Sequence, residues 1–258
     1  DHDHSPQTDA SETGAPETSD DEDASALDRR TFLRRSALGA AGMSAMPASG
    51  EAFSVEKRRQ EGWRTLFGGE ETDLEGWEHV GPGGFDLQDG VLHSRGGMGL
   101  LWYTEEQISD AVVRVVYDVA NNDVNAGVFI RIPEPPEDPW YAVHNGYEVQ
   151  IDNGFRFHHS DYHVTGVLYS LTEAMAYPQK QPGEWNTMDI TLDGPVTMVH
   201  VNGEKVTHYA EGQPVPEERK WFEPERGPRP DSGYIGLQNH DDQSEVLIRE
   251  VSVRPLEG

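Results

Sequence analysis

The stretch Gly146-Tyr147-Glu148-Val149-Gln150-Ile151-Asp152 alternates apolar and polar side chains, which is typical of a β-strand with one buried face. Its polar face carries a carboxylate, a carboxamide and a second carboxylate, from Glu148, Gln150 and Asp152. A solvated strand face more often carries Thr, Ser or Lys. Two interpretations remain open: the row lines a polar cleft that acts on a sugar-like substrate, or it is a hydrated outer face.

Short apolar runs separated by turn residues fill the chain from Gly62 onward. Asp89-Gly90, Asp193-Gly194 and Asn202-Gly203 are turn signals between such runs. There is no long stretch with the 3.6-residue period of a helix, and many short strands at near-regular spacing predict an all-β sandwich or jelly roll. The expected strands are Trp63–Phe67, Phe85–Gln88, Val91–Ser94, Leu100–Tyr103, Ala111–Val119, Ala126–Ile132, Gly146–Ile151, Gly166–Tyr169, Trp185–Asp193, Thr197–Val201, Lys205–Tyr209, Gly233–Gln238 and Val246–Pro255.

The chain is strongly acidic, with 47 acidic against 20 basic residues and a net charge of −27. Ten of the acidic residues precede Arg29, the first basic residue, so the excess of acid continues through the rest of the chain. This charge excludes nucleic acid as a partner and argues against binding to anionic membrane surfaces. Because salt screens such self-repulsion, we infer a salt-loving host. The chain has no cysteine, so it offers no disulfide, thiolate nucleophile or Cys-ligated metal.

The first 52 residues differ in composition from the rest. Residues 1–28 are acidic and polar with little to bury, and they are predicted to be disordered. Residues 29–52 begin with paired arginines, followed by Phe32-Leu33 and a weakly apolar run, and they resemble a twin-arginine export signal. A short amphipathic helix in a tail is the alternative. The apolar run is too short for a membrane span, so we expect export to the cell envelope or the medium without a stable membrane span.

A series of short motifs follows in a fixed order along residues 62–256. Leu66-Phe67-Gly68-Gly69 and Leu74-Glu75-Gly76-Trp77 open the series, which resembles the 3-keto-disaccharide hydrolase-like domain family. Each motif is weak alone, but the ordered set is specific. The later members are Asp89–Leu92, Asn125–Arg131, Gly146–Ile151, Thr165–Tyr169, Pro182–Asn186, Val201–Gly203, Gly236–His240 and Arg249–Leu256.

This resemblance implies a concanavalin-like jelly roll of two stacked antiparallel sheets over residues 62–258. It also implies a role with glycosides, in particular sugars oxidised at C3. The expected partner is therefore a small-molecule glycoside.

Candidate site residues lie on several of these motifs. Glu148 and Gln150 share one strand face, roughly 7 Å apart, and supply the mixed donors and acceptors that sugar hydroxyls need. Arg131 closes an apolar strand, and its guanidinium could bind hydroxyls or merely neutralise Glu148. Gln238 and His240 lie two residues apart near a strand end, where His is a natural proton carrier.

Three further residues are candidates for substrate binding. Trp185 could stack on a sugar face or fill the core, and the core is the stronger expectation. Asn186 and Tyr169 are polar residues on neighbouring motifs. The Pro-rich stretches Pro133–Pro139 and Gln213–Pro230 are expected to be loops that wall a cleft.

A divalent metal would be the only cofactor to consider, and no metal ligand can be assigned. His158, His159, Asp161 and His163 would suit such an ion, but their spacing is not that of a rigid site and a solvated loop is the better interpretation. Asp152 could bind a hard cation, although a role in a turn is the stronger expectation.

The function expected from these residues is cleavage of a 3-keto-glycoside by removal of the C2 proton and β-elimination of the C1 substituent. Glu148 and His240 would be the base and the acid in an undetermined order, and Arg131 or a bound metal would stabilise the oxyanion. Gln150 and Gln238 would hold hydroxyls. One alternative is an ordinary two-carboxylate glycosidase, for which the sequence gives no convincing second carboxylate. The other is a non-catalytic carbohydrate-binding module with an aromatic platform of Trp102, Trp140 and Tyr141.

Overall fold

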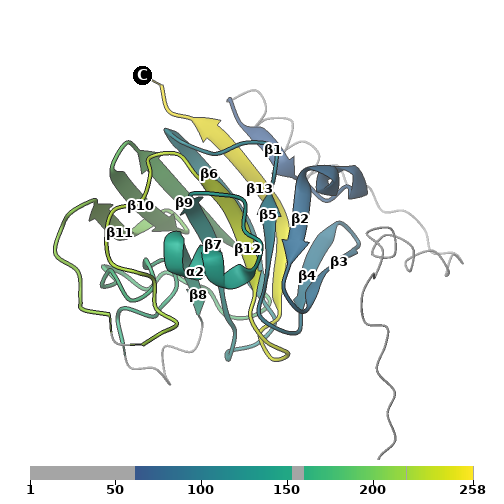
Figure 1. Ribbon diagram of the computed structural model, residues 1–258. Helices are drawn as coiled ribbons and strands as arrows, with labels where there is room; N and C mark the ends of the chain where they lie inside the picture. Colours follow the sequence, from purple (N-terminus) through teal and green to yellow (C-terminus); the bar gives the residue numbers. More distant parts are fainter. Residues whose placement is uncertain (1–61, 153–159, 219, 258) are drawn as a thin grey trace, which may run out of the picture. The chain divides into compact units, whose positions relative to one another are not determined.

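The computed structural model describes residues 62–152, 160–218 and 220–257, which form a jelly-roll sandwich of two antiparallel sheets (Figure 1). This confirms the all-β jelly roll expected from the sequence. Segments 1–28 and 29–52, expected to be a disordered tail and an export signal, lie outside the described residues.

The larger sheet has eight strands. Seven of them follow the order β11-β10-β9-β6-β13-β4-β3, and β1 pairs with part of β13. Type I′-like turns at Asp89-Gly90 and Asn202-Gly203, with positive φ at both residues, join neighbouring strands as expected from the sequence. In chain order the strands are β1 (Arg64–Phe67), β3 (Gly84–Gln88), β4 (Val91–Arg95), β6 (Ala111–Val119), β9 (Asn186–Asp193), β10 (Val196–Val201), β11 (Glu204–Ala210) and β13 (Val246–Pro255).

The smaller sheet has five strands in the order β2-β5-β12-β7-β8. Its strand β8 carries the polar row of Glu148, Gln150 and Asp152. The five strands are β2 (Trp77–Val80), β5 (Gly99–Tyr103), β7 (Asn125–Ile132), β8 (Tyr147–Asp152) and β12 (Tyr234–Asn239).

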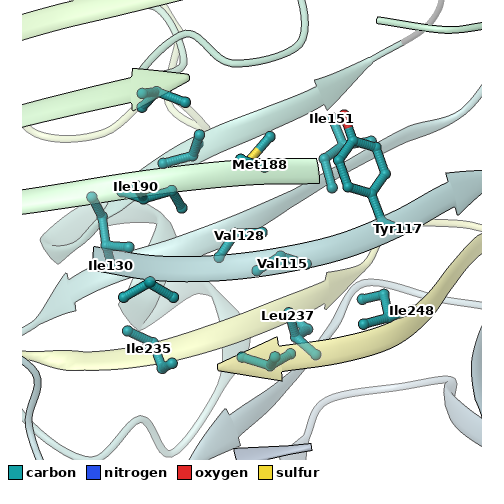
Figure 2. Close-up of a cluster of buried hydrophobic side chains, with 14 of the residues drawn as sticks. Val115, Tyr117, Val128, Ile130, Ile151, Met188, Ile190, Ile235, Leu237 and Ile248 are labelled. Carbon is teal, nitrogen blue, oxygen red and sulfur yellow. The ribbon is translucent and has the colours of Figure 1, made fainter. Parts of the chain in front are cut away.

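The main hydrophobic core lies between the two sheets, as Figure 2 shows. Alternate side chains of facing strands point into it, and burial of each aliphatic side chain of this size stabilises the fold by roughly 1.5–3 kcal/mol relative to exposure. The larger sheet contributes Val115, Tyr117, Met188, Ile190 and Ile248, and the smaller sheet contributes Val128, Ile130, Ile151, Ile235 and Leu237.

A second apolar cluster lies on the opposite, outer face of the smaller sheet, under the short helix α2 (Pro139–Asn145). Figure 1 shows the position of α2 beside this sheet. The carboxylate of Asp138 accepts hydrogen bonds from the backbone N–H groups of Trp140 and Tyr141 at 2.8 and 3.2 Å and so begins the helix. Among the described residues, no helix is long and apolar enough to cross a membrane. The cluster consists of Leu100, Trp102, Phe129, Ile132, Ala142 and Val143.

Most expected strands are present within a residue or two, and the exceptions have identifiable causes. Segment Gly166–Tyr169 forms turns with a single bridge between Val149 and Leu168, so the expected strand there is wrong. The positive φ of Gly166 and of Ser170 breaks the extended conformation. Strand β2, helix α2 and the 3₁₀ helix Glu71–Gly76 were not expected from the sequence.

Candidate active site

A cleft of about 730 Å³ lies on the outer face of the smaller sheet, beside α2. Its walls come from α2, from segment 160–170 and from residues 216–217 and 220–226, which confirms the expectation that Gln213–Pro230 forms part of a cleft wall. No residue of Pro133–Pro139 lines it; the α2 residue Trp140 does so instead. The floor comprises the polar residues Asn125, Glu148, Gln150, Gln238 and His240 together with Met98.

Glu148 lies on this floor with only 8% of its surface exposed. Its side chain lies over Gly127 of the neighbouring strand, where an added Cβ would come within 2.5 Å of the Glu148 Cγ and Oε1 atoms. Burial, with a smaller contribution from the negative charge of Asp152, raises the pKa of Glu148 from 4.5 to about 8. Glu148 is therefore mostly protonated near neutral pH and can act as a general acid.

A hydrogen-bonded chain connects Gln150 to His240 across the floor. Gln150 Nε2 donates to Asn125 Oδ1 at 2.8 Å, and Asn125 Nδ2 donates to His240 Nε2 at 3.1 Å. His240 Nε2 therefore accepts, which leaves the ring proton on Nδ1, 2.7 Å from a carboxylate oxygen of Asp241. A carboxylate thus orients the imidazole, which is the arrangement of a general base.

Two amide oxygens on the floor lack a partner. The Oε1 atoms of Gln150 and Gln238 are both buried, and neither has a hydrogen-bond partner among the described residues. An unsatisfied buried acceptor costs about 1–3 kcal/mol, so its persistence at a site calls for a ligand or a water molecule. Both side chains line the cleft, and a hydroxyl-rich ligand would supply the missing donors.

Tyr169 reaches the cleft because segment Gly166–Tyr169 runs along the free edge of β8. The Tyr169 N–H donates to the Glu148 carbonyl at 2.9 Å, and the Gln150 N–H donates to the Val167 carbonyl at 3.0 Å. The Tyr169 ring stacks on His163 with a centroid distance of 5.0 Å. Burial first, then the charges of Glu148, Glu223 and Asp152, raise the pKa of Tyr169 to about 12, so its hydroxyl remains a proton donor.

Glu223 is a second carboxylate in the cleft wall that the sequence interpretation missed. Only 6% of it is exposed, and Arg226 Nη2 donates to its Oε2 at 2.9 Å. Arg226 also donates to the Pro216 and Pro224 carbonyls at 2.8 and 2.6 Å, which fixes its guanidinium. The only signal in the sequence was the three-residue spacing of Glu223 and Arg226 within a Pro-rich loop, which is too common to be diagnostic.

The structure does not bring Arg131 to the cleft. Arg131 is fully buried in a bulge of β7, where its φ is +54° and two β7 residues oppose a single β12 residue. Its guanidinium donates to the carbonyls of Pro230 at 2.8 Å, Gly194 at 2.7 Å and Val196 at 3.3 Å. These contacts tie β7 to the β9–β10 turn in the larger sheet, so its place in the fold is that of a structural link between sheets.

Asn186 and Trp185 are also absent from the cleft lining. Asn186 is fully buried, accepts from the Lys180 N–H and Asn202 Nδ2, and donates to the Glu184 carbonyl. Trp185 is half-buried under the Arg249 guanidinium, 4.5 Å from the ring centroid. Both residues organise the loop that enters β9.

The His-rich cluster is only partly described, because His158 and His159 lie outside the described residues. His163 lines the cleft, whereas Asp161 accepts a hydrogen bond from the Tyr177 hydroxyl. Asp152 ends β8, where its backbone N–H and carbonyl both bond to the Thr165 hydroxyl. In the part of the chain that the structure describes, no group of three or more His, Asp or Glu side chains is arranged to hold a metal ion.

Comparisons with known proteins match this domain to one family. The family model described as a 3-keto-alpha-glucoside-1,2-lyase-like domain matches residues 62–254. No curated protein matches the chain. Among solved structures, a candidate glycosyl hydrolase from Parabacteroides distasonis is 25% identical, with a TM-score of 0.61 over 75% of this chain and 99% of that one. A second candidate glycosyl hydrolase from the same organism is 21% identical, with a TM-score of 0.60 over 78% of this chain and 97% of that one.

Proposed function

This chain belongs to the family of 3-keto-alpha-glucoside-1,2-lyase-like domains, and we propose that it cleaves 3-keto-glycosides by β-elimination. One observation carries the proposal: the floor of a single cleft holds a protonated carboxylic acid, an imidazole oriented by a carboxylate and two unpartnered amide oxygens. Together these groups match a polyhydroxylated substrate that must lose one proton and gain another.

The reaction needs a base, an acid and a donor for a developing oxyanion. The C3 carbonyl acidifies the C2 proton, and His240 Nε2 removes it once the substrate displaces the amide of Asn125. The C1–O bond breaks, a C1=C2 double bond forms, and the glycosidic oxygen takes the proton of Glu148. Water then adds its hydroxyl to C1 and gives its proton to the Glu148 carboxylate, while the protonated His240 returns its proton to C2, which restores the 3-keto sugar and both side chains.

Tyr169 takes the role that the sequence interpretation gave to Arg131. Its hydroxyl stays protonated at neutral pH, lies in the same cleft as Glu148, and can donate to the enolate oxygen at C3. Gln150 and Gln238 accept hydrogen bonds from sugar hydroxyls.

The test is release of free sugar from a 3-keto-disaccharide and from its unoxidised parent, each with and without a chelator. We expect release from the keto sugar alone, with a loss of about 10²–10⁴-fold in Glu148→Gln and in His240→Ala, since each removes a proton-transfer group. The matched control is Glu78→Gln, an exposed carboxylate in the same sheet that does not line the cleft. Full activity in both cleft variants would refute the assignment of Glu148 as the acid and His240 as the base. Loss of activity with the chelator would show that the reaction also requires a metal ion.

Glu223 supports a second candidate function, an ordinary two-carboxylate glycosidase. It supplies the second carboxylate that the sequence alone could not identify, held by Arg226 in the same cleft as the protonated Glu148. In that case the unoxidised parent would also be cleaved, and Glu223→Gln would abolish its cleavage. Binding of both sugars without release would instead identify a carbohydrate-binding module.

A further inference from the structure

Three aromatic rings, two of them exposed, form a group beside the cleft. Trp221 is 68% exposed and Phe222 is 38% exposed, although large apolar side chains in the described part of the chain are mostly buried. The Trp221 ring lies 4.7 Å from the ring of Trp140 and 5.7 Å from that of Phe222, centroid to centroid. We refer to Trp140, Trp221 and Phe222 as the aromatic ledge.

The aromatic ledge is held in place by contacts between α2 and the segment after Lys220. His144 Nε2 donates to the Trp221 carbonyl at 2.9 Å, and the Glu225 N–H donates to the His144 carbonyl at 3.1 Å. Arg229 Nη2 donates to the same His144 carbonyl at 2.8 Å, and the His144 ring stacks on Trp140. The exposed indole of Trp221 is thus part of a fixed surface, whose exposure is unfavourable unless something covers it.

The aromatic ledge is continuous with the cleft. Trp140 and Phe222 both line the cleft, and Glu223 follows Phe222 directly. Trp221 lies outside the lining and extends it through its ring contacts with Trp140 and Phe222. The site therefore changes from a polar floor at Glu148 to an apolar, aromatic rim. A ligand that spans both parts has a hydroxyl-rich end for the floor and a ring with an apolar face for the rim.

We propose that the aromatic ledge is the subsite for a ring carried by the C1 substituent of the substrate, either a second pyranose or an aryl group. This rests on the proposed function, because the C1 substituent is the group that leaves. Both kinds of ring present a flat apolar face to an indole, and such stacking contributes roughly 0.5–1.5 kcal/mol, or about 3- to 10-fold in affinity.

The test compares binding of three glycosides that share one sugar: methyl, phenyl and disaccharide. Dissociation constants are measured by calorimetry with the full chain, using the unoxidised series and, in the Glu148→Gln background, the 3-keto series. We expect the phenyl glycoside and the disaccharide to bind about 3- to 10-fold more tightly than the methyl glycoside. Trp221→Ala should remove this difference and leave methyl-glycoside affinity within about twofold, whereas Trp221→Phe should retain part of it.

Met175→Ala is the matched control, because Met175 is 65% exposed and does not line the cleft. A preference for the phenyl glycoside alone would assign the ledge to aryl groups, and a preference for the disaccharide alone would assign it to a pyranose. Equal affinity of all three glycosides for the unsubstituted chain would refute the proposal that the aromatic ledge is a subsite. It would leave the proposed function intact. No binding in either series would overturn both. A dimer that Trp221→Ala dissociates would show that the ledge is an interface between protein chains, which also refutes the proposal.

Discussion

Glu148 is a carboxyl group that the fold keeps protonated at neutral pH. Gly127 leaves the space that the side chain occupies, and burial disfavours the charged form. Glu148 therefore keeps its proton until a leaving group in the same desolvated site accepts it.

The activity should therefore depend on the ionisation of Glu148. Because the protonated form donates to the leaving group, we expect kcat/KM to fall tenfold per pH unit above about 8, the pKa to which burial raises this carboxyl. A pH profile from 5 to 10 with a 3-keto-glycoside measures this. The residual activity of Glu148→Gln should not show this fall at alkaline pH. If the fall is unchanged in the variant, the ionisation of another group causes it.

The same carboxyl should make stability depend on pH. Its pKa is about 8 in the folded chain against an ordinary value of 4.5, so the folded state binds more protons between these pH values. The free energy of unfolding therefore falls as pH rises through that range. The contribution is fully present below 4.5 and is lost above about 8. Denaturant titrations measure the free energy of unfolding of both chains. Between pH 5 and pH 9 the unsubstituted chain should lose about 2–4 kcal/mol relative to Glu148→Gln. Parallel pH curves would contradict this.

Gly127 should matter for activity more than for folding. An added methyl group would come within 2.5 Å of Glu148, so we expect Gly127→Ala to displace the carboxyl and to lower kcat/KM by about 10²-fold. Kinetics with a 3-keto-disaccharide, beside a thermal melt, measures this. Shortening the displaced side chain in Gly127→Ala/Glu148→Asp should recover part of the loss, and full activity of Gly127→Ala alone would refute the contact.

Most strands could be predicted from the sequence, whereas helix α2, which packs on the smaller sheet, was not predicted. Alternation identified β8 and a long apolar run identified β6, whereas β2 is short and its His79 and Glu78 obscure the pattern. Helix α2 had a usable signal, because Asp138-Pro139 is the pairing of an N-cap with Pro at the first helical position.

The same distinction applies to the site. Glu148 and Gln150 were identifiable because they share one face of a strand. Gln238 and His240 were identifiable because they lie two residues apart near the end of another strand. Glu223 lies on an irregular loop. In such a loop, unlike in a strand, the spacing of residues does not predict which way a side chain points. Arg131 was misleading because its bulge turns the side chain away from the face that strict alternation would give it.

The Arg131 link between the two sheets gives a prediction at this scale. Arg131→Met would remove the buried guanidinium that donates to three carbonyls, so we expect a loss of about 2–4 kcal/mol in the free energy of unfolding. Activity per folded molecule should change little, because the residue does not line the cleft. Chemical denaturation and kinetics on the same sample measure both quantities. Normal stability with lost activity would return Arg131 to the site.

The whole molecule carries a net charge of −27, with only four lysines, at positions 57, 180, 205 and 220. Self-repulsion of this size opposes compactness at low ionic strength and is screened when the Debye length falls to about 3 Å at 1 M salt. The charge therefore affects the stability of the fold more than the choice of fold.

Stability should rise with salt. We expect the thermal midpoint to increase by several degrees between 0.05 and 1 M NaCl, equivalent to about 1–2 kcal/mol. Calorimetry in NaCl, with matched sucrose solutions as an uncharged control, measures the screening contribution. A midpoint that stays flat or falls as salt is added would contradict the inference of a salt-adapted protein.

Segment Gly166–Tyr169 has a second consequence through its hydrogen bonds to β8. Without it, β8 would present a bare row of amide and carbonyl groups, to which a strand of another molecule could add. The turn that blocks this route to aggregation also delivers Tyr169 to the cleft. Solubility and chemistry thus depend on one short piece of chain, and substitutions selected for either property alter the other.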